Sequence, residues 1–529
     1  MKTEVAVIGA GTGGCAAALA AAEAGRKVVM TCPHDWVGGQ LTAQAVPPDE
    51  HWAIERYGST RSYRNFRNKI REYYRRNYPL LPKFQTEALF NPGGGRVSRL
   101  CFEPRIGLAV LSELFAKYIS CGTIKILHYH TPVGCERASG KIRRVYLRDA
   151  RTEKHCELEA DYFLDATELG DLLPLSGEDY VTGAESQKDT GEPHALAGDS
   201  NPEDVQGFTW CMLMSLDHNQ HPDTDIYRVE CPAQYQKWKN YIPELDPPWT
   251  GPLFSDLVIH PETMKPCVRP FFRDAQQGEG FSYWRYRQII SRNRYCESYN
   301  TYDTTCVNWP HNDYIEGNVI DKPTEVVEKY LEESRQLTLS LFYWLQNEAP
   351  RPDGGRGYGN LFPRPDLSGN EHGLALEPYF RESRRIKGLF TVTENHVGKA
   401  ARQGKKAETF SDSVGTGYYR IDLHPSSAGR NYIDLDSLPF QIPLGALIPQ
   451  KTGNLLAAAK NISVTHIANG CYRLHPVEWN IGESAGALAA FCLGKNCSPR
   501  MVRENTHLLE EFQSLLFARG VDLEWPAVG

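Results

Sequence analysis

The 529-residue sequence predicts an α/β fold, in which parallel strands and helices alternate, and three observations lead to this prediction. An apolar run at residues 4–8 leads into a glycine-rich turn at 9–14 and then into an alanine-rich segment at 15–24. Gly25 is suited to end that helix, and residues 26–31 supply a second strand. Further apolar runs at residues 161–166 and 454–459 predict strands far along the chain. The sheet is therefore expected to combine distant segments.

The glycine-rich turn has the spacing G-x-G-x-x-G. In this pattern Gly9 forms the tight turn, Gly11 lets a diphosphate approach the backbone, and Gly14 allows the helix to pack on the strand. The amides at the helix start would then face the phosphates. A bare strand-to-helix turn is the alternative, but the position between a strand and an alanine-rich helix favours a Rossmann-like nucleotide site.

The loop after the second strand favours FAD over NAD. Residues 35–42 contain a Gly-Gly pair, Gly38 and Gly39, followed by Gln40 and Leu41. This pattern is typical of flavoproteins in which the loop runs along the ribityl chain and the flavin ring. We therefore expect this loop to contact the cofactor.

One position departs from that pattern. Flavoproteins of this kind usually carry an acidic residue at the end of the second strand, where it binds the adenosine ribose. Cys32 takes this position here, and a thiol is a poor acceptor. Thr31, His34 or Asp35 could bind the ribose instead.

Composition sets the broad class of protein. With 41% apolar and 23% charged residues the chain is an ordinary globular protein, long enough for two or three domains. The net charge of -7 argues against bulk nucleic-acid binding. No run of eighteen apolar residues predicts a membrane helix, and a strand that starts at residue 3 leaves no room for a signal peptide. We expect a cytoplasmic protein.

The fourteen cysteines include no C-x-x-C pair, so no metal site is expected. In a reducing compartment most of them should be buried thiols. Cys471 lies in a segment expected near the flavin, yet a redox or nucleophilic role is the less favoured interpretation.

The character of the sequence changes twice along the chain. Residues 175–395 mix Pro, Asp, Trp and Tyr in irregular order, whereas apolar strands are expected again at 389–393 and 454–459. We expect a discontinuous FAD-binding domain (1–175 and 395–500), an inserted α+β substrate or cap domain (176–394) and a C-terminal helix (501–529). A small-residue helix from residue 480, starting near Gly482 and Glu483, would direct its positive end at the flavin.

An arginine-rich stretch at residues 56–78 places Arg64, Arg67, Arg71 and Arg75 at helical spacing. A solvated basic face with its aromatic residues turned inward is the favoured interpretation. A nucleic-acid or phosphate surface is the alternative.

With these motifs the chain resembles the FAD-dependent oxidoreductase family, some of whose paralogues are loosely labelled xanthan lyase. The resemblance lies in residues 36–42 with 47–51, residues 308–310, residues 381–386 and the helix around residue 482. It implies a glutathione-reductase-like or succinate-dehydrogenase-like fold with FAD, and no particular substrate. A strand ends in Ala166 and Thr167 where such flavoproteins have Ala-Thr-Gly, but Glu168 replaces the glycine. The expected cofactor contacts are Gly9, Gly11, Gly14, Cys32, Gly38, Gly39, Gln40, Leu41, Val133, Ala166, Thr167, Asn461, Gly482 and Glu483.

Candidates for the chemistry lie near the expected flavin edge. A histidine before the C-terminal helix could act as a base and an arginine could bind an anion, although a structural role is favoured for each single histidine. The arginines at 381–385 could bind a substrate carboxylate or pair with glutamates at the domain junction. The candidates are His475, His466 and Arg381 for catalysis, and Arg473, Asn312, Trp309 and Arg384 for substrate binding.

We therefore expect an FAD-dependent dehydrogenase or oxidase that transfers hydride to flavin N5 from a small polar substrate bearing a carboxylate or hydroxyls. An external electron acceptor or O2 would complete the cycle. A flavin monooxygenase or reductase using NAD(P)H is one alternative, although no second glycine fingerprint follows a strand. An RNA-associated flavoprotein is the other. A homo-oligomer is compatible with the sequence, and a covalent link to FAD through His51 is conceivable.

Overall fold

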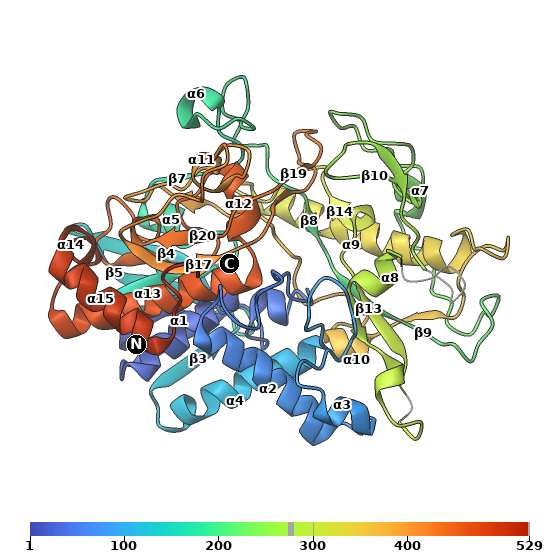
Figure 1. Ribbon diagram of the computed structural model, residues 1–529, viewed down its shortest axis with the longest axis horizontal. Coiled ribbons are helices and arrows are strands. Elements are labelled where there is room, and N and C mark those ends of the chain that lie inside the picture. The colour runs from blue at the N-terminus through green and yellow to red at the C-terminus, as the bar shows by residue number, and fades with distance from the viewer. Residues whose placement is uncertain (273–279, 300, 527–529) are drawn as a thin grey trace.

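The computed structural model describes residues 1–272, 280–299 and 301–526, and its largest sheet has seven strands (Figure 1). The strand order is β3-β2-β1-β6-β5-β4, with β21 also paired to β6. The parallel strands are β1 (Lys2–Ile8), β2 (Val28–Cys32), β3 (Ile124–His128), β6 (His155–Asp165) and β21 (Leu455–Ala457). β5 (Lys141–Asp149) pairs antiparallel with β6, and β4 (His130–Ala138) pairs antiparallel with β5 at the edge of the sheet. The predicted α/β fold, with its sheet completed by a distant strand, is confirmed.

The N-terminal helix α1 (Thr12–Glu23) packs against the C-terminal helix α13 (His475–Lys495), as Figure 1 shows. Small residues make this contact possible. A Cβ on Gly482 would lie 1.9 Å from the carbonyl oxygen of Gly13, and a Cβ on Gly486 would lie 2.2 Å from that of Ala17. The two backbones are therefore in direct contact, and α13 packs on the first turns of α1, next to the glycine turn.

The expected start of this helix was wrong. α13 begins at His475, with Pro476 in its first turn, so Gly482 and Glu483 lie within the helix instead of at its N-terminus. The carboxylate of Glu483 accepts a hydrogen bond from Ser62. Proline is favoured in the first helical turn because its missing N–H is not needed there, which explains the earlier start.

The arginine-rich stretch forms α2 (Arg61–Asn77), which packs beside α4 (Pro104–Ser120). Its aromatic residues are turned inward as expected, with Phe66 stacked on Trp479. The fully solvated basic face was wrong: Arg67 and Arg71 are each 1% exposed and pair with Glu55. Since two of the four arginines are held inside the protein, the surface available for nucleic acid is smaller than the sequence suggested.

A second lobe is built on an antiparallel sheet with the order β12-β13-β9-β15. Its strands are β9 (Met212–Leu216), β12 (Gln288–Ile290), β13 (Asp303–Val307) and β15 (Leu361–Pro363), and the long helix α9 (Thr324–Asn347) packs nearby (Figure 1). The lobe has its own hydrophobic core, which includes Trp284, Trp309 and Trp344. These tryptophans therefore serve as core residues.

Shorter helices and strands lie within the two units and between them. They are α3 (Pro82–Thr86), α5 (Leu172–Ser176), β7 (Tyr180–Val181), α6 (Gln187–Thr190), β8 (Phe208–Thr209), α7 (Tyr235–Lys239), β10 (Leu257–Ile259), β11 (Pro266–Val268), α8 (Tyr283–Tyr286), β14 (Asp313–Tyr314), α10 (Pro365–Ser368), β16 (Arg385–Ile386), α11 (Glu394–Val397), β17 (Ser413–Gly417), β18 (Ile421–Leu423), β19 (Ile433–Leu435), β20 (Phe440–Pro443) and α12 (His466–Tyr472). The β18–β19 hairpin adds Tyr432 to the core of the second lobe. We retain 1–175 with 395–500 and 176–394 as proposed domain boundaries.

Two further expectations differ from the structure. Residues 389–393 form no strand and contribute only an isolated bridge between Val392 and Val464. The C-terminal segment contains two helices, α14 (Pro499–Glu504) and α15 (Thr506–Arg519), and residues 527–529 of the expected helix lie outside the described residues. In the described part of the chain, no helix combines the length and apolar character needed to cross a bilayer.

Candidate active site

A cavity of about 170 Å³ lies where the glycine turn meets the ends of β2 and β6 and the start of β4. Gly9 has a positive φ of 105°, and a Cβ there would lie 2.2 Å from the carbonyl oxygen of Ala166, so only glycine fits. Six expected cofactor residues line this cavity: Gly9, Gly11, Cys32, Gly39, Ala166 and Thr167. The strand ends and the glycine turn thus converge on one cavity, which we call the cradle.

The remaining expected cofactor residues lie around the cradle or away from it. Gly14 packs beneath the turn against the backbone of Gly9. Val133 follows the cavity residue Pro132 and is 41% exposed, whereas Asn461 binds the carbonyl oxygen of Asp165. Gly38 and Leu41 belong to the buried Gly-Gly loop. Gly482 packs against the backbone of Gly13 and Glu483 accepts a hydrogen bond from Ser62, so neither residue lines the cradle.

Cys32 sits at the cradle edge beside His34. The Sγ of Cys32 lies 3.7 Å from His34 Nδ1, and His34 Nε2 lies 3.4 Å from the carboxylate of Glu377. Glu377 comes from the second lobe and lines the same cavity. An acidic group is therefore present near the position where the strand itself carries a thiol.

Two more carboxylates lie at the start of α1. Glu168 forms an ion pair with the buried amine of Lys460. Glu478 accepts hydrogen bonds from the amide of Gly13, at 3.3 Å, and from Gln40 Nε2, at 2.6 Å. Burial raises the pKa of Glu478 to about 7 despite the opposing charge of Lys460.

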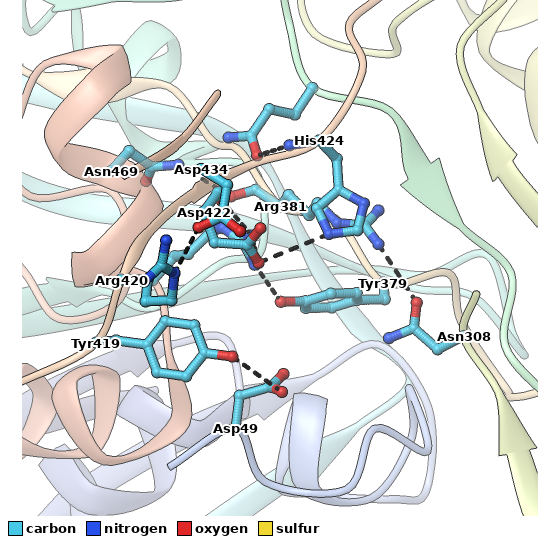
Figure 2. A network of polar contacts seen from close by, with 12 residues as sticks. Asp49, Asn308, Tyr379, Arg381, Tyr419, Arg420, Asp422, His424, Asp434 and Asn469 are labelled. Carbon is cyan, nitrogen blue, oxygen red and sulfur yellow. Dashed lines mark hydrogen bonds and ion pairs between the residues drawn. The ribbon is translucent and has the colours of Figure 1, made fainter. Parts of the chain in front are cut away.

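A buried polar network joins the two lobes beyond the cradle (Figure 2). Arg381 donates to Asp313 at 2.9 Å, and the other carboxylate oxygen of Asp313 contacts His424 Nδ1 at 2.6 Å. His424 Nε2 lies 3.7 Å from Asp422, whose backbone oxygen accepts from Arg473. Aspartate side chains therefore alternate with arginine and histidine side chains from the second lobe to the connection between α12 and α13.

The basic partners in this network lower the pKa values of its buried aspartates. Although burial acts in the opposite direction, Arg381 and His424 lower the pKa of Asp313 to about 2. The pKa of Asp422 is also lowered, because His424 and Arg473 outweigh its burial. Both aspartates are thus charged at neutral pH, and they pair with Arg381 and Arg473.

Arg473 extends the network to the flavin loop. Its Nη1 donates to the hydroxyl of Tyr379 at 2.6 Å, and its carbonyl oxygen accepts from Gln40 at 3.1 Å. Asp49 lies on the same side, with its carboxylate 3.4 Å from both Tyr419 and Arg287. This is the point where the cradle and the network come together.

His475 and His466 do not have the free acceptor nitrogen that a general base needs. His475 Nδ1 accepts the amide N–H of Asp49 at 3.1 Å, so Nε2 carries the proton of the neutral ring. Burial lowers the pKa of His475 to about 4 and keeps the ring neutral. His466 is held between Glu382 and Arg430. His475 Nε2 is therefore placed as a hydrogen-bond donor, whereas both ring nitrogens of His466 have side-chain partners.

The other candidates have structural partners. Arg384 binds Asp171 and Asp321, and thus follows the ion-pair alternative with different partners from those expected. Asn312 donates to Trp210 O, Val307 O and Thr338 Oγ1, and stabilises the loop that follows β13. Trp309 is 1% exposed in the lobe core. These three residues do not reach the network through any described hydrogen bond.

Sequence reasoning missed most of the acidic half of the network. Asp49 was visible only as part of the segment at residues 47–51, and Asp313 follows directly after the candidate Asn312. Asp422 and His424 alternate along β18 and its end, which is also the pattern of an ordinary exposed strand. No sequence motif distinguishes them.

The fold and the cradle define a dinucleotide-binding protein of the flavoprotein class. Residues 4–516 match the family model described as FAD dependent oxidoreductase. The chain therefore belongs to this family, the resemblance seen in the sequence is confirmed, and the protein is an FAD-dependent oxidoreductase with FAD as its cofactor. Such an enzyme needs a small-molecule substrate and an electron acceptor.

Comparison with curated proteins finds no match. Among solved structures, a geranylgeranyl bacteriochlorophyll reductase-like protein from Thermoplasma acidophilum is 10% identical, with 98% of this chain and 84% of that chain covered and a TM-score of 0.34. The quinol fumarate reductase of E. coli is 13% identical, with 98% of this chain and 74% of that chain covered and a TM-score of 0.33. L-proline dehydrogenase from P. horikoshii is 15% identical, with 36% of this chain covered and a TM-score of 0.19. The match spans 25% of that protein's length. TM-scores this low carry no inference about function.

The residues present fit FAD at most of the cradle. Gly9, Ala10 and Gly11 of the glycine turn line the cavity directly before α1 begins, and Gly39 of the Gly-Gly loop lies against Gly11. The departures are Cys32 at the ribose position and the two carboxylates at the start of α1. These departures are local, and the cradle as a whole suits a dinucleotide.

Proposed function

We propose that this oxidoreductase oxidises a small polar substrate, with a carboxylate or several hydroxyls, bound in the buried network between the two lobes. Unsatisfied donors support this proposal. His475 Nε2 and the Nε atoms of Arg287, Arg381 and Arg473 are buried and have no hydrogen-bond partner among the described residues. Because unpaired buried donors are costly, a ligand rich in acceptor oxygens would be favoured there.

The cofactor would be held by the cradle residues. Amides at the start of α1 would bind the diphosphate, and the loop with Gly38 and Gly39 would follow the ribityl chain. FAD, when bound, supplies the acceptor for a hydride from the substrate. The chain's own residues must then orient the substrate, exclude water and accept one proton.

Four residues in and beside the network have roles in this proposal. Arg473 and Tyr379 orient the substrate, because they link the flavin loop to the second lobe. His475 donates from Nε2 to a substrate oxygen. Asp49 accepts the proton, since its carboxylate has contacts of 3.4 Å with Tyr419 and Arg287 and the residue is 3% exposed. The burial of these side chains excludes bulk water.

The proposal can be tested by anaerobic reduction of the bound flavin. Hydroxy acids, amino acids and polyols are added singly, and bleaching of the flavin spectrum is followed. We expect a compound bearing a carboxylate or several hydroxyls to bleach the wild type, and D49N to bleach more slowly while it keeps its FAD. Bleaching by NADPH alone would instead favour the monooxygenase or reductase alternative.

A further inference from the structure

Glu168 occupies the space that the glycine turn leaves for a diphosphate. A Cβ on Gly11 would lie 2.7 Å from Glu168 Oε1, and a Cβ on Gly39 would lie 3.0 Å from the same oxygen. Gly11 is the fingerprint residue whose missing side chain lets the diphosphate approach. The carboxylate therefore lies between the turn and the Gly-Gly loop, within the cavity.

Lys460 is the cation that binds this carboxylate. Its side chain is 1% exposed and pairs with Glu168 Oε2, whereas the side chain of Glu168 is 16% exposed. A buried ammonium is costly without an anion beside it. Lys460 therefore needs either Glu168 or another anion at this position.

Other groups around the pair are mostly acidic or neutral. Glu478 of α13 accepts from the amide of Gly13, so a second carboxylate uses the start of α1. The other titratable side chains around the pair and Glu478 are Cys15 of α1, Asp171 beyond β6, and Glu377 and Tyr379 of the second lobe. His34 at the cavity edge pairs with Glu377, and Arg384 pairs with Asp171. Lys460 is the cation that pairs with Glu168 at the glycine turn, and a diphosphate bound there must compete for it.

We propose that Glu168 is an internal substitute for the FAD diphosphate: it binds Lys460 and fills the glycine turn in the free protein, and FAD binding transfers Lys460 to the diphosphate. Glu168 lies in the turn after β6 and is already partly exposed, so its side chain can rotate to solvent without displacing a strand. Lys460 is thus a cofactor-binding residue and Glu168 a competitor that weakens the affinity for FAD. This inference concerns the cofactor site and does not depend on the identity of the substrate.

The test measures binding to flavin-free protein by flavin fluorescence and by the rise in melting temperature. The variants are E168G, E168Q and K460M, and E157Q is the matched control because Glu157 lies on the exposed part of β6 and pairs with Arg144. ADP and riboflavin are titrated in parallel, since ADP has the diphosphate and riboflavin has none.

We expect E168G and E168Q to bind FAD and ADP roughly tenfold more tightly than the wild type, because a competing charged group is removed. Riboflavin binding should not change, E157Q should match the wild type, and K460M should weaken FAD and ADP roughly tenfold. If E168G does not fold, E168Q decides, because it keeps the length of the side chain. Wild-type or weaker FAD affinity in the folded Glu168 variants would overturn the proposal, as would an equal gain for riboflavin.

Discussion

Arg473 and Tyr379 connect the two lobes through a hydrogen bond of 2.6 Å between Nη1 and the phenol oxygen. Both side chains are 2% exposed, and the carbonyl oxygen of Arg473 accepts from Gln40 in the Gly-Gly loop. The same arginine therefore contacts the cofactor loop and the second lobe. A substrate bound against Tyr379 would have a fixed position relative to the flavin loop.

Y379F should lower kcat/KM for the oxidised substrate roughly tenfold, because Arg473 Nη1 loses its acceptor in a buried site. The FAD content should stay at the wild-type value, since the cradle residues are untouched. Steady-state kinetics and the flavin absorbance of the purified protein measure the two quantities. Y146F, which removes a hydroxyl from β5, is the control. An unchanged kcat/KM in Y379F would argue against a substrate site at the network.

The affinity for FAD should fall as pH rises through about 7, the raised pKa of Glu478. Below this pH the buried carboxyl is neutral, and above it a negative charge at the start of α1 repels the diphosphate. Titrations of flavin-free protein at pH 6 and pH 8 measure the effect. E478Q should lose most of this dependence, because the amide cannot ionise. A wild-type affinity that is equal at the two pH values would contradict this role of Glu478.

G482A should destabilise the protein by about 1–3 kcal/mol or more, because the new methyl would meet the backbone of Gly13. G494A is the matched control on the same helix, where a Cβ meets only the end of the flexible Arg26 side chain at 3.2 Å. There the better helix propensity of alanine should leave stability unchanged or raise it by up to about 1 kcal/mol. Chemical denaturation of both variants gives the comparison, and equal stabilities would show that α1 and α13 can separate without cost.

Glu382 should make stability depend on pH at low pH. His466 and Arg385 together outweigh the burial of this carboxyl and lower its pKa from 4.5 to about 2. A lowered pKa contributes stability above the unfolded-state value, and that contribution is lost as pH falls from about 4.5 toward 2. The full effect is about 3 kcal/mol. Denaturation of the wild type and E382Q at pH 7 and pH 3 should show a smaller loss of stability in E382Q, whereas equal losses would exclude Glu382.

The sequence predicted the parts of the fold that depend on local patterns. The strand at residues 4–8, the glycine turn and the helix after it follow from residue type and spacing, and β1 and α1 have the expected places. The start of α13 was missed because small residues inside a buried helix look like a helix start, whereas His475 and Pro476 look like a loop. The network could not be predicted in full, because Asp313, Asp422 and Arg473 come from separate segments and meet only through tertiary packing.

Glu377 is expected to replace the acidic residue that is missing at Cys32 and to bind the adenosine ribose of FAD. Its carboxylate lines the cradle, contacts His34 Nε2 and accepts from Gln44 at 3.1 Å, so it is held in place from two sides. Ribose hydroxyls donate well to a carboxylate and poorly to a thiol. The wild type should therefore bind ADP roughly tenfold more tightly than 2′,3′-dideoxy-ADP, and E377Q should lose most of that preference. C32A should retain it, because the thiol has no part in this contact. Calorimetric titration of the three proteins with both nucleotides tests the assignment. A preference for ADP that persists in E377Q but is lost in C32A would instead place the ribose contact at the end of β2.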